Sequence, residues 1–323
     1  MDKGNEYNDL SYPKRGDFLI NGKYLFEVGG KNKTFDQIAD VRSKPSGKTF
    51  LKSIFCFSAR KRINCYVLRK LMKIVLVQTD IVWGNPSENI VNATKAMDAH
   101  PGADLYVLPE MFSTGFATKP VGLAEEAPSV SLEWMKKYAA AHDCAIYGSV
   151  ALHEGGKFYN RGYFVKPDGC VEQYDKRHLF SNGGEKQFFT AGEQRKIVEF
   201  RGVRFLLLIC YDMRFPVWIR CREDYDVILC CANWPKVRQY AWDMLCTARA
   251  MENQAYLIGV NRTGMEPGIE YEGGSVFVQP FGYAVERLGA ETGEIEAEID
   301  MDFLRHQRES FSALRDADRF ELI

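Results

Sequence analysis

The chain has 323 residues, and its 46% apolar and 26% charged content is typical of a globular protein. Its net charge is −1, which gives no sign of nucleic acid or of an anionic membrane as a partner. No apolar stretch approaches the length of a membrane span, and the N-terminus has no apolar signal-peptide region. We therefore expect neither a nucleic-acid partner nor a membrane partner.

The cysteine content indicates the compartment. There are nine cysteines, an odd number, and no two of them have the C-x-x-C spacing. This pattern fits neither a disulfide framework nor a zinc site. We expect reduced thiols in the cytoplasm, and neither a metal nor a cofactor.

The first 71 residues differ in charge from the rest of the chain. They contain 15 lysines and arginines against 7 acidic residues, whereas the remainder contains 27 against 36. Residues 24–38, Y-L-F-E-V-G-G-K-N-K-T-F-D-Q-I, weakly resemble a C-terminal piece of a family of bacterial AAA-type ATPases. We predict an N-terminal extension at 1–71 and one domain at 72–323, with Met72 as the natural start. A regulatory or oligomerisation arm is the alternative for 1–71.

From residue 72 onward, strands and helices are expected to alternate. Short apolar or alternating runs predict strands, and apolar residues at helical spacing predict helices. The predicted strands are 73–78, 105–108, 145–151, 158–165, 171–174, 196–200, 205–209, 227–232, 255–260, 272–279, 284–287 and 294–299. The predicted helices are 85–100, 131–142, 216–220, 238–252 and 301–310. Two sheets with helices on both outer faces account for this number of strands.

Cys210 is the candidate nucleophile. The apolar run Phe205–Ile209 suits a strand that is buried on both faces, and it ends at this cysteine. A thiol at the end of such a strand can face a cleft, and the backbone N–H of Tyr211 can then point at a developing oxyanion. A buried structural cysteine is the alternative.

Two more charged residues lie at strand ends. The apolar run Leu105–Leu108 is followed by Glu110, and the strand-like stretch Val171–Tyr174 is followed by Lys176. A carboxylate, an ammonium group and a thiol can therefore meet at the carboxyl ends of neighbouring strands.

Three motifs around these residues resemble a known family. They are P-E-M-F-S-T-G-F, Y-D-K-R-H-L-F and L-I-C-Y-D-M-R-F-P. In type and order they look like the Glu-Lys-Cys motifs of the nitrilase (carbon–nitrogen hydrolase) superfamily, and the likeness runs from Met72 to the C-terminus. It implies an α/β fold, the four-layer α-β-β-α sandwich, and a homodimer or larger homo-oligomer formed through outer helices. It also implies that a second glutamate, Glu185, holds Lys176 in place.

The residue types suit a cysteine-dependent amidase. The thiolate is the attacking species, and Glu110 can serve as the base that generates it. Lys176 can favour the thiolate and stabilise the oxyanion of the tetrahedral intermediate. Glu110 would then protonate the departing ammonia and activate the water that hydrolyses the thioester.

Within the superfamily the motifs look most like the omega-amidase branch, which implies a small amide of a 2-oxo acid, such as 2-oxoglutaramate, as substrate. We expect Phe116, Tyr211 and Trp234 to shape the pocket, and Arg249 to bind a substrate carboxylate or to pair with Glu252. The motifs leave open an N-carbamoyl amine hydrolase or a nitrilase. A binding scaffold with a vestigial site is the alternative from a different functional class.

Overall fold

The computed structural model describes residues 10–11, 18–20, 24–26, 71–282 and 285–321. The chain divides into two compact units, Met1–Lys70 and Leu71–Ile323. In the first unit, β1 (Leu10–Ser11), β2 (Phe18–Ile20) and β3 (Tyr24–Phe26) form a small antiparallel sheet. The rest of the predicted extension, including most of the ATPase-like stretch, lies outside the described residues.

The second unit contains two large sheets. One has the order β18-β4-β5-β7-β8-β9, with β6 paired to β7. Its strands β4, β5 and β7 are parallel to one another. Its strands are β4 (Met72–Gln78), β5 (Leu105–Val107), β6 (Glu125–Glu126), β7 (Ala145–Glu154), β8 (Lys157–Val165), β9 (Val171–Asp175) and β18 (Gly293–Ile299).

The other sheet has the order β10-β11-β12-β13-β16-β17. Its strands are β10 (Ile197–Phe200), β11 (Val203–Ile209), β12 (Val227–Cys231), β13 (Tyr256–Val260), β16 (Val276–Val278) and β17 (Val285–Arg287). Because β11, β12 and β13 are parallel, their carboxyl ends lie at the same edge of the sheet.

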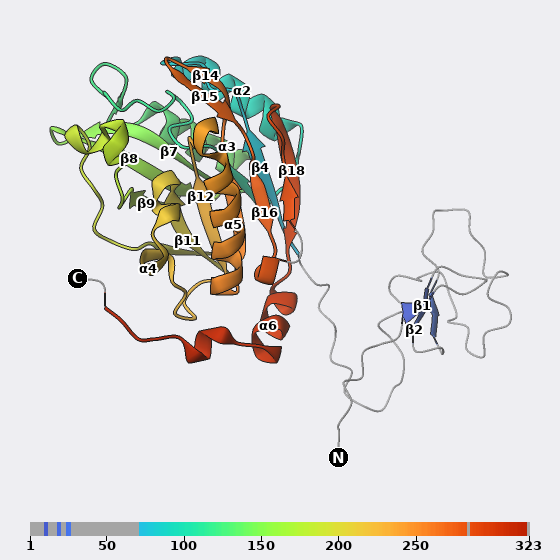
Figure 1. The fold of residues 1–323 in the computed structure, drawn as a ribbon. Helices are drawn as coiled ribbons and strands as arrows, with labels where there is room; N and C mark the ends of the chain where they lie inside the picture. The colour runs from blue at the N-terminus through green and yellow to red at the C-terminus, as the bar shows by residue number, and fades with distance from the viewer. Residues whose placement is uncertain (1–9, 12–17, 21–23, 27–70, 283–284, 322–323) are drawn as a thin grey trace, which may run out of the picture. The chain divides into compact units, whose positions relative to one another are not determined.

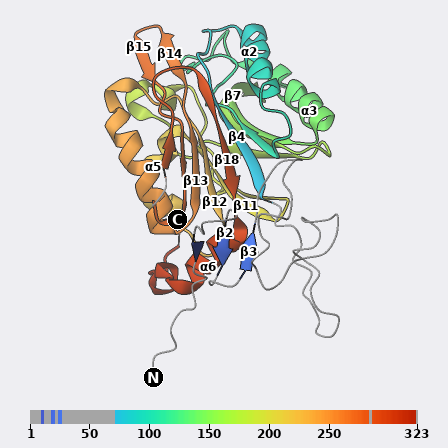
Figure 2. The same ribbon diagram turned by 90° about the vertical axis from the view of Figure 1, so that its right-hand side faces the viewer.

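Alternation along β4 shows how the layers form. Ile74 and Leu76 belong to the apolar core shared with β11, β12 and β13, whereas Val75 and Val77 belong to the core under the helices. These helices are α2 (Pro86–Asp98) and α3 (Val130–His142), and α5 (Gln239–Asn253) covers the other sheet. Figures 1 and 2 show α2 and α3 on one side of the strands and α5 on the other. The predicted four-layer α-β-β-α sandwich is confirmed.

Local signals set the element ends. Asn85 caps α2 by accepting the Glu88 N–H, and Pro86 occupies the first turn. The two remaining α-helices of this unit among the described residues are shorter, namely α4 (Pro216–Ile219) and α6 (Met301–Ser310).

One predicted strand is wrong. The stretch 272–279 is divided, because Gly273 and Gly274 both have positive φ, 65° and 77°, which ends one strand and starts another. The first part belongs to a hairpin of β14 (Thr263–Glu266) and β15 (Ile269–Glu272), and the second part is β16. The sequence did not predict β14, which pairs with β15 in a separate two-stranded sheet.

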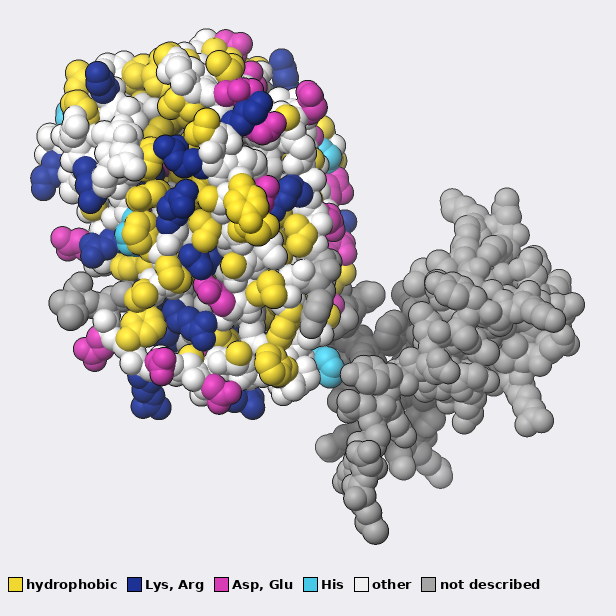
Figure 3. All heavy atoms as spheres, in the orientation of Figure 1, with side chains coloured by type: hydrophobic (Ala, Val, Ile, Leu, Met, Phe, Trp, Pro, Cys, Tyr) yellow, Lys and Arg dark blue, Asp and Glu magenta, His cyan; other side chains and the backbone are white. Residues whose placement is uncertain are grey.

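The outer surface of α5 is partly apolar. Tyr240, Met244 and Met251 are 78%, 50% and 50% exposed, and their spacing places them on one stripe of the helix. Figure 3 shows apolar side chains, interspersed with basic ones, over the face that carries α5 in Figure 1. None of the helices in the part of the chain that the structure describes is long and apolar enough to cross a membrane.

Candidate active site

Cys210 lies directly after β11, at the start of the 3-10 helix η4 (Cys210–Arg214), and has a positive φ of 44°. Such a backbone conformation is unfavourable for a residue with a Cβ and persists where surrounding contacts enforce it. Asp212 supplies those contacts: its carboxylate accepts the N–H of Ile209 and the hydroxyl of Tyr174. The turn therefore holds the thiol at the carboxyl end of a buried strand.

The carboxylate of Glu110 is fully buried and uses both oxygens. Oε1 accepts Lys176 Nζ at 2.8 Å and Asn160 Nδ2 at 2.7 Å, and Oε2 accepts the Asn233 backbone N–H at 2.8 Å. These partners come from both sheets, because Lys176 follows β9 and Asn233 follows β12. The predicted meeting of Glu110, Lys176 and Cys210 is what the structure shows.

Glu185 lies on the other side of the Lys176 ammonium group. Its Oε2 is 3.0 Å and its Oε1 3.2 Å from Lys176 Nζ, and Oε2 also accepts the Phe180 N–H at 2.6 Å. The loop that carries Glu185 returns to Lys176 at Gly192, whose N–H donates to the Lys176 carbonyl. A Cβ at Gly192 would lie 2.1 Å from the Asp175 carbonyl oxygen, so only glycine allows this approach.

The charges of this cluster shift the pKa of each partner. Burial alone would lower the pKa of Lys176, but the carboxylates of Glu110 and Glu185 raise it well above its ordinary value. Burial raises the pKa of Glu185, although the Lys176 ammonium opposes that rise. Burial and the charge of Glu110 also raise the pKa of the Cys210 thiol well above its ordinary value, against the effect of Lys176. The raised pKa of Cys210 favours the neutral thiol over the thiolate.

Asn160 is a member of the cluster that the sequence did not reveal. Its Nδ2 donates to Oε1 of both Glu110 and Glu185, at 2.7 and 3.0 Å, and its Oδ1 accepts the Ser149 hydroxyl. Asn160 keeps the two carboxylates at a fixed separation without adding charge. The only sequence signal was a polar residue within the otherwise buried half of β8, which a structural hydrogen bond also explains.

A cavity of about 310 Å³ opens above the thiol. It is lined by Cys210 together with Phe116, Tyr211 and Trp234, the three residues expected to shape the substrate pocket. The Lys176 ammonium lies 5.3 Å from the centre of the Phe116 ring, which places that ring against the charged cluster.

Of the two alternatives for Arg249, the structure shows the pairing with Glu252. Arg249 does not line this cavity, because its guanidinium donates to the Met213 carbonyl and to Glu252. Arg214, which follows the nucleophile by four positions, and Arg238 line the cavity instead. They lie over the rings of Trp234 and Phe180, at 4.8 and 5.1 Å, and neither has a carboxylate partner among the described residues.

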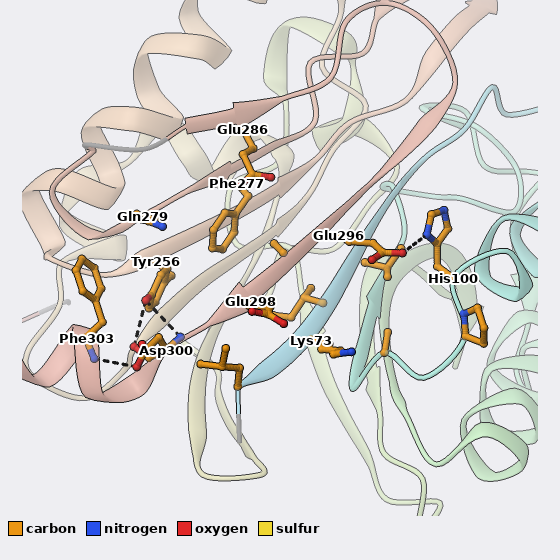
Figure 4. A pocket seen from close by; sticks show the side chains of 16 residues that line it. Lys73, His100, Tyr256, Phe277, Gln279, Glu286, Glu296, Glu298, Asp300 and Phe303 are labelled. Carbon is orange, nitrogen blue, oxygen red and sulfur yellow. Dashed lines mark hydrogen bonds and ion pairs between the residues drawn. The ribbon is translucent and has the colours of Figure 1, made fainter. Parts of the chain in front are cut away.

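A second cavity of about 590 Å³ lies at the opposite ends of the strands (Figure 4). Lys73 near the start of β4 and Tyr256 at the start of β13 are among the residues that line it. It is lined by acidic side chains such as Glu296, which contacts His100. No Cys, Ser or Thr is among the described residues that line it. The described parts of the chain also contain no group of three or more His, Cys, Asp or Glu that could hold a metal ion.

Comparison with known proteins gives a consistent result. The carbon–nitrogen hydrolase family profile matches residues 73–309. The chain is 43% identical over 253 residues to the omega-amidase YafV of Escherichia coli strain K12, covering 78% of this chain and 98% of that protein. It is 36% identical over 249 residues to the 2-oxoglutaramate amidase of Bacillus subtilis, covering 75% of this chain and 96% of that protein.

A solved structure agrees with this fold. The crystal structure of XC1258 from Xanthomonas campestris, a CN-hydrolase superfamily protein with an arsenic adduct in the active site, has a TM-score of 0.76 and 35% identity. The match covers 78% of this chain and 99% of that one. An amidase from Nesterenkonia, solved as a C145A mutant, has a TM-score of 0.65 and 26% identity, covering 74% and 95%.

The neutral resting thiol leads to a prediction for Glu110→Gln. Without a base beside the thiol, turnover should fall by about 10²- to 10⁴-fold. The residual rate should rise with pH between about pH 6 and 9, because only the thiolate then attacks. The measurement is kcat as a function of pH. Glu270→Gln, an exposed carboxylate that lines the same cavity, is the matched control and should keep the normal rate and profile. A pH-independent residual rate in Glu110→Gln would contradict this role.

Proposed function

The chain belongs to the carbon–nitrogen hydrolase family, and we propose that it hydrolyses the omega-amide of a small 2-oxo acid such as 2-oxoglutaramate. The observation that carries the proposal is one cavity with Cys210 at its base, the buried Glu110–Lys176–Glu185 cluster beside the thiol, and two guanidinium groups on its wall. A linear substrate with an amide at one end and a carboxylate at the other complements this arrangement.

Acylation begins when Sγ of Cys210 attacks the amide carbon while Glu110 takes the thiol proton. The carbonyl oxygen becomes an oxyanion. Lys176 Nζ donates to Glu110 Oε1 and to both oxygens of Glu185. If one ammonium hydrogen is shared between the two Glu185 oxygens, the third hydrogen can face the oxyanion. The Tyr211 N–H, among the first of η4, has no acceptor within the helix and supplies a second donor. Glu110 then protonates the leaving nitrogen, and ammonia departs.

Deacylation reverses the roles of the same groups. Glu110 takes a proton from the water that attacks the thioester carbon, and Lys176 and the Tyr211 N–H again stabilise the oxyanion. The C–S bond breaks, the proton returns to Sγ, and the acid leaves. Glu185 does not exchange a proton in this scheme. It holds the Lys176 ammonium in place and keeps it charged.

The substrate carboxylate is expected to bind Arg214, with Arg238 contributing charge. Both guanidinium groups are half-buried beside aromatic rings. Solvent and salt therefore screen their attraction to a carboxylate less than at an open surface. A guanidinium group matches a carboxylate in geometry and donates two parallel hydrogen bonds. In this proposal Arg214 has the carboxylate-binding role that was one of the two alternatives for Arg249.

We also infer a homodimer in the cytoplasm. The apolar stripe of Tyr240, Met244 and Met251 on α5 is the type of surface that a second copy covers. The seven cysteines among the described residues are all free, which is consistent with a reducing compartment.

The proposed reaction is tested by ammonia release from the full chain with 2-oxoglutaramate, glutamine and an N-carbamoyl amine in parallel. We expect release from 2-oxoglutaramate to be fastest, and to be abolished in Cys210→Ala because no acyl-enzyme can form. Turnover of only the N-carbamoyl amine would move the protein to another branch of the family. Full activity in Cys210→Ala would contradict the mechanism.

Arg214→Gln separates carboxylate binding from chemistry. We expect KM for 2-oxoglutaramate to rise by about 10- to 100-fold with a small change in kcat, because a charge-assisted hydrogen bond to the far end of the substrate is lost. A simple aliphatic amide without a carboxylate is the control substrate, and its kcat/KM should not change. Equal losses for both substrates would show that Arg214 acts on the fold of the site instead.

Met244→Glu tests the dimer. A charge in the centre of the α5 stripe should convert the dimer to a monomer, since burying an unpaired carboxylate is costly. Sedimentation velocity gives the mass directly. Ala140→Glu adds the same charge to the exposed side of α3 and should leave the dimer intact. A wild-type protein that is already monomeric would overturn the inference.

A further inference from the structure

We propose that the side-chain carboxamide of Asn233 binds the nitrogen of the scissile amide and orients it toward Glu110, which makes Asn233 a determinant of specificity for primary amides. The inference rests on the proposed amidase function and assigns a further residue to the same site.

The observation is a buried amide side chain without partners. Asn233 is 3% exposed, yet neither its Nδ2 nor its Oδ1 has a hydrogen-bond partner among the described residues. Asn261, the first residue after the next parallel strand, β13, has a side chain that is fully used: Nδ2 donates to the Trp234 and Gly273 carbonyls, and Oδ1 accepts the Trp234 N–H. A buried polar group without a partner is unfavourable, so Asn233 is suited to a ligand that supplies one.

The location of Asn233 identifies that ligand. Its backbone N–H donates to Glu110 Oε2 and also contacts the Cys210 thiol. Asn233 lines the same cavity as Cys210. The carboxamide therefore branches from the backbone directly beside the base and the nucleophile, and the group nearest to it during the reaction is the scissile amide rather than the distant carboxylate.

The hydrogen-bonding requirements of the amide complete the argument. Its carbonyl oxygen is accounted for by Lys176 and the Tyr211 N–H. Its nitrogen carries two hydrogens that need acceptors, and after the thiol attacks it also carries a lone pair that must receive a proton from Glu110. Asn233 Oδ1 is an acceptor without a competing donor. If Oδ1 accepts one N–H, the lone pair can turn toward Glu110, and the C–N bond breaks as ammonia forms.

This contact distinguishes nitrogen from oxygen in the leaving group. An omega-ester of the same acid passes through the same thioester, but its leaving oxygen carries no hydrogen for Oδ1 to accept. A site that is built to bind a substrate N–H discriminates strongly against an analogue that lacks it. The contact also disfavours a carboxylate product, since Oδ1 would then face a second oxygen.

The test compares the omega-amide and the omega-methyl ester of 2-oxoglutarate in the full chain. Asn233→Leu keeps the branched shape of the side chain and removes both polar atoms, and it should lower kcat/KM for the amide by about 10- to 100-fold and for the ester by less than about threefold. Asn233→Ala is the second variant in case leucine disturbs folding. Asn182→Ala, an exposed asparagine at the same cavity, is the matched control and should change neither value.

If the ester is hydrolysed too slowly for its kcat/KM to be measured, the affinities of the amide and the ester are compared instead. In the Cys210→Ala background, adding Asn233→Leu should weaken amide binding about 10-fold and leave ester binding nearly unchanged, as measured by calorimetry. Equal losses for amide and ester, in rates or in binding, would overturn the inference and assign Asn233 a structural role. If the wild type ignores 2-oxoglutaramate but cleaves another amide, the proposed substrate fails and the same comparison is made with that amide and its ester. Absence of turnover of every amide would overturn both proposals.

Discussion

The Lys176 ammonium group, buried between the carboxylates of Glu110 and Glu185, is the interaction on which the site depends. A buried charge is costly unless it is paired and its hydrogen bonds are satisfied. Lys176 satisfies this condition only if the loop after β5, the turn after β9 and the loop that carries Glu185 are all in place. The ion cluster therefore ties together segments that are separate in sequence, and it does so directly beside the thiol.

The charge of the cluster also determines the chemistry. Two carboxylates and one ammonium group leave a net negative charge next to Cys210, and a thiolate would add a second one. The thiol is accordingly held neutral, as the raised pKa of Cys210 indicates. In the proposed mechanism, proton transfer to Glu110 accompanies attack on the substrate, which links activation of the thiol to the presence of its target. Asn160 supports this arrangement because it donates to both carboxylates and adds no charge.

The position of the cavity follows from the sheet topology. Parallel strands present their carboxyl ends at one edge, so Cys210 after β11 and Asn233 after β12 lie side by side. The acidic cavity at the opposite strand ends is larger, but no Cys, Ser or Thr is among its described lining residues. Volume alone does not identify an active site; the buried cluster of complementary charges beside a nucleophile does.

The sequence by itself determined the layers and the first members of the site. Strand and helix periodicity is local, and it places Glu110, Lys176 and Cys210 at or just past the ends of predicted strands without knowledge of distant partners. Glu185 followed only from resemblance to a family, because a glutamate in a glycine-rich loop has no local sign of burial. The hairpin β14–β15 was missed because its strands are short and lie outside the main sheets.

Only the tertiary structure decided which polar side chains face the thiol. The side chain of Asn160 and the backbone N–H of Asn233 contact Glu110 across 50 and 123 residues of sequence, and no local pattern encodes such pairs. The same holds for Arg214 and Arg249, which both lie near apolar residues in sequence. Packing pairs Arg249 with Glu252 and directs Arg214 toward the cavity. Burial and partner distance are properties of the folded chain, and they separate a structural side chain from one that is free to bind substrate.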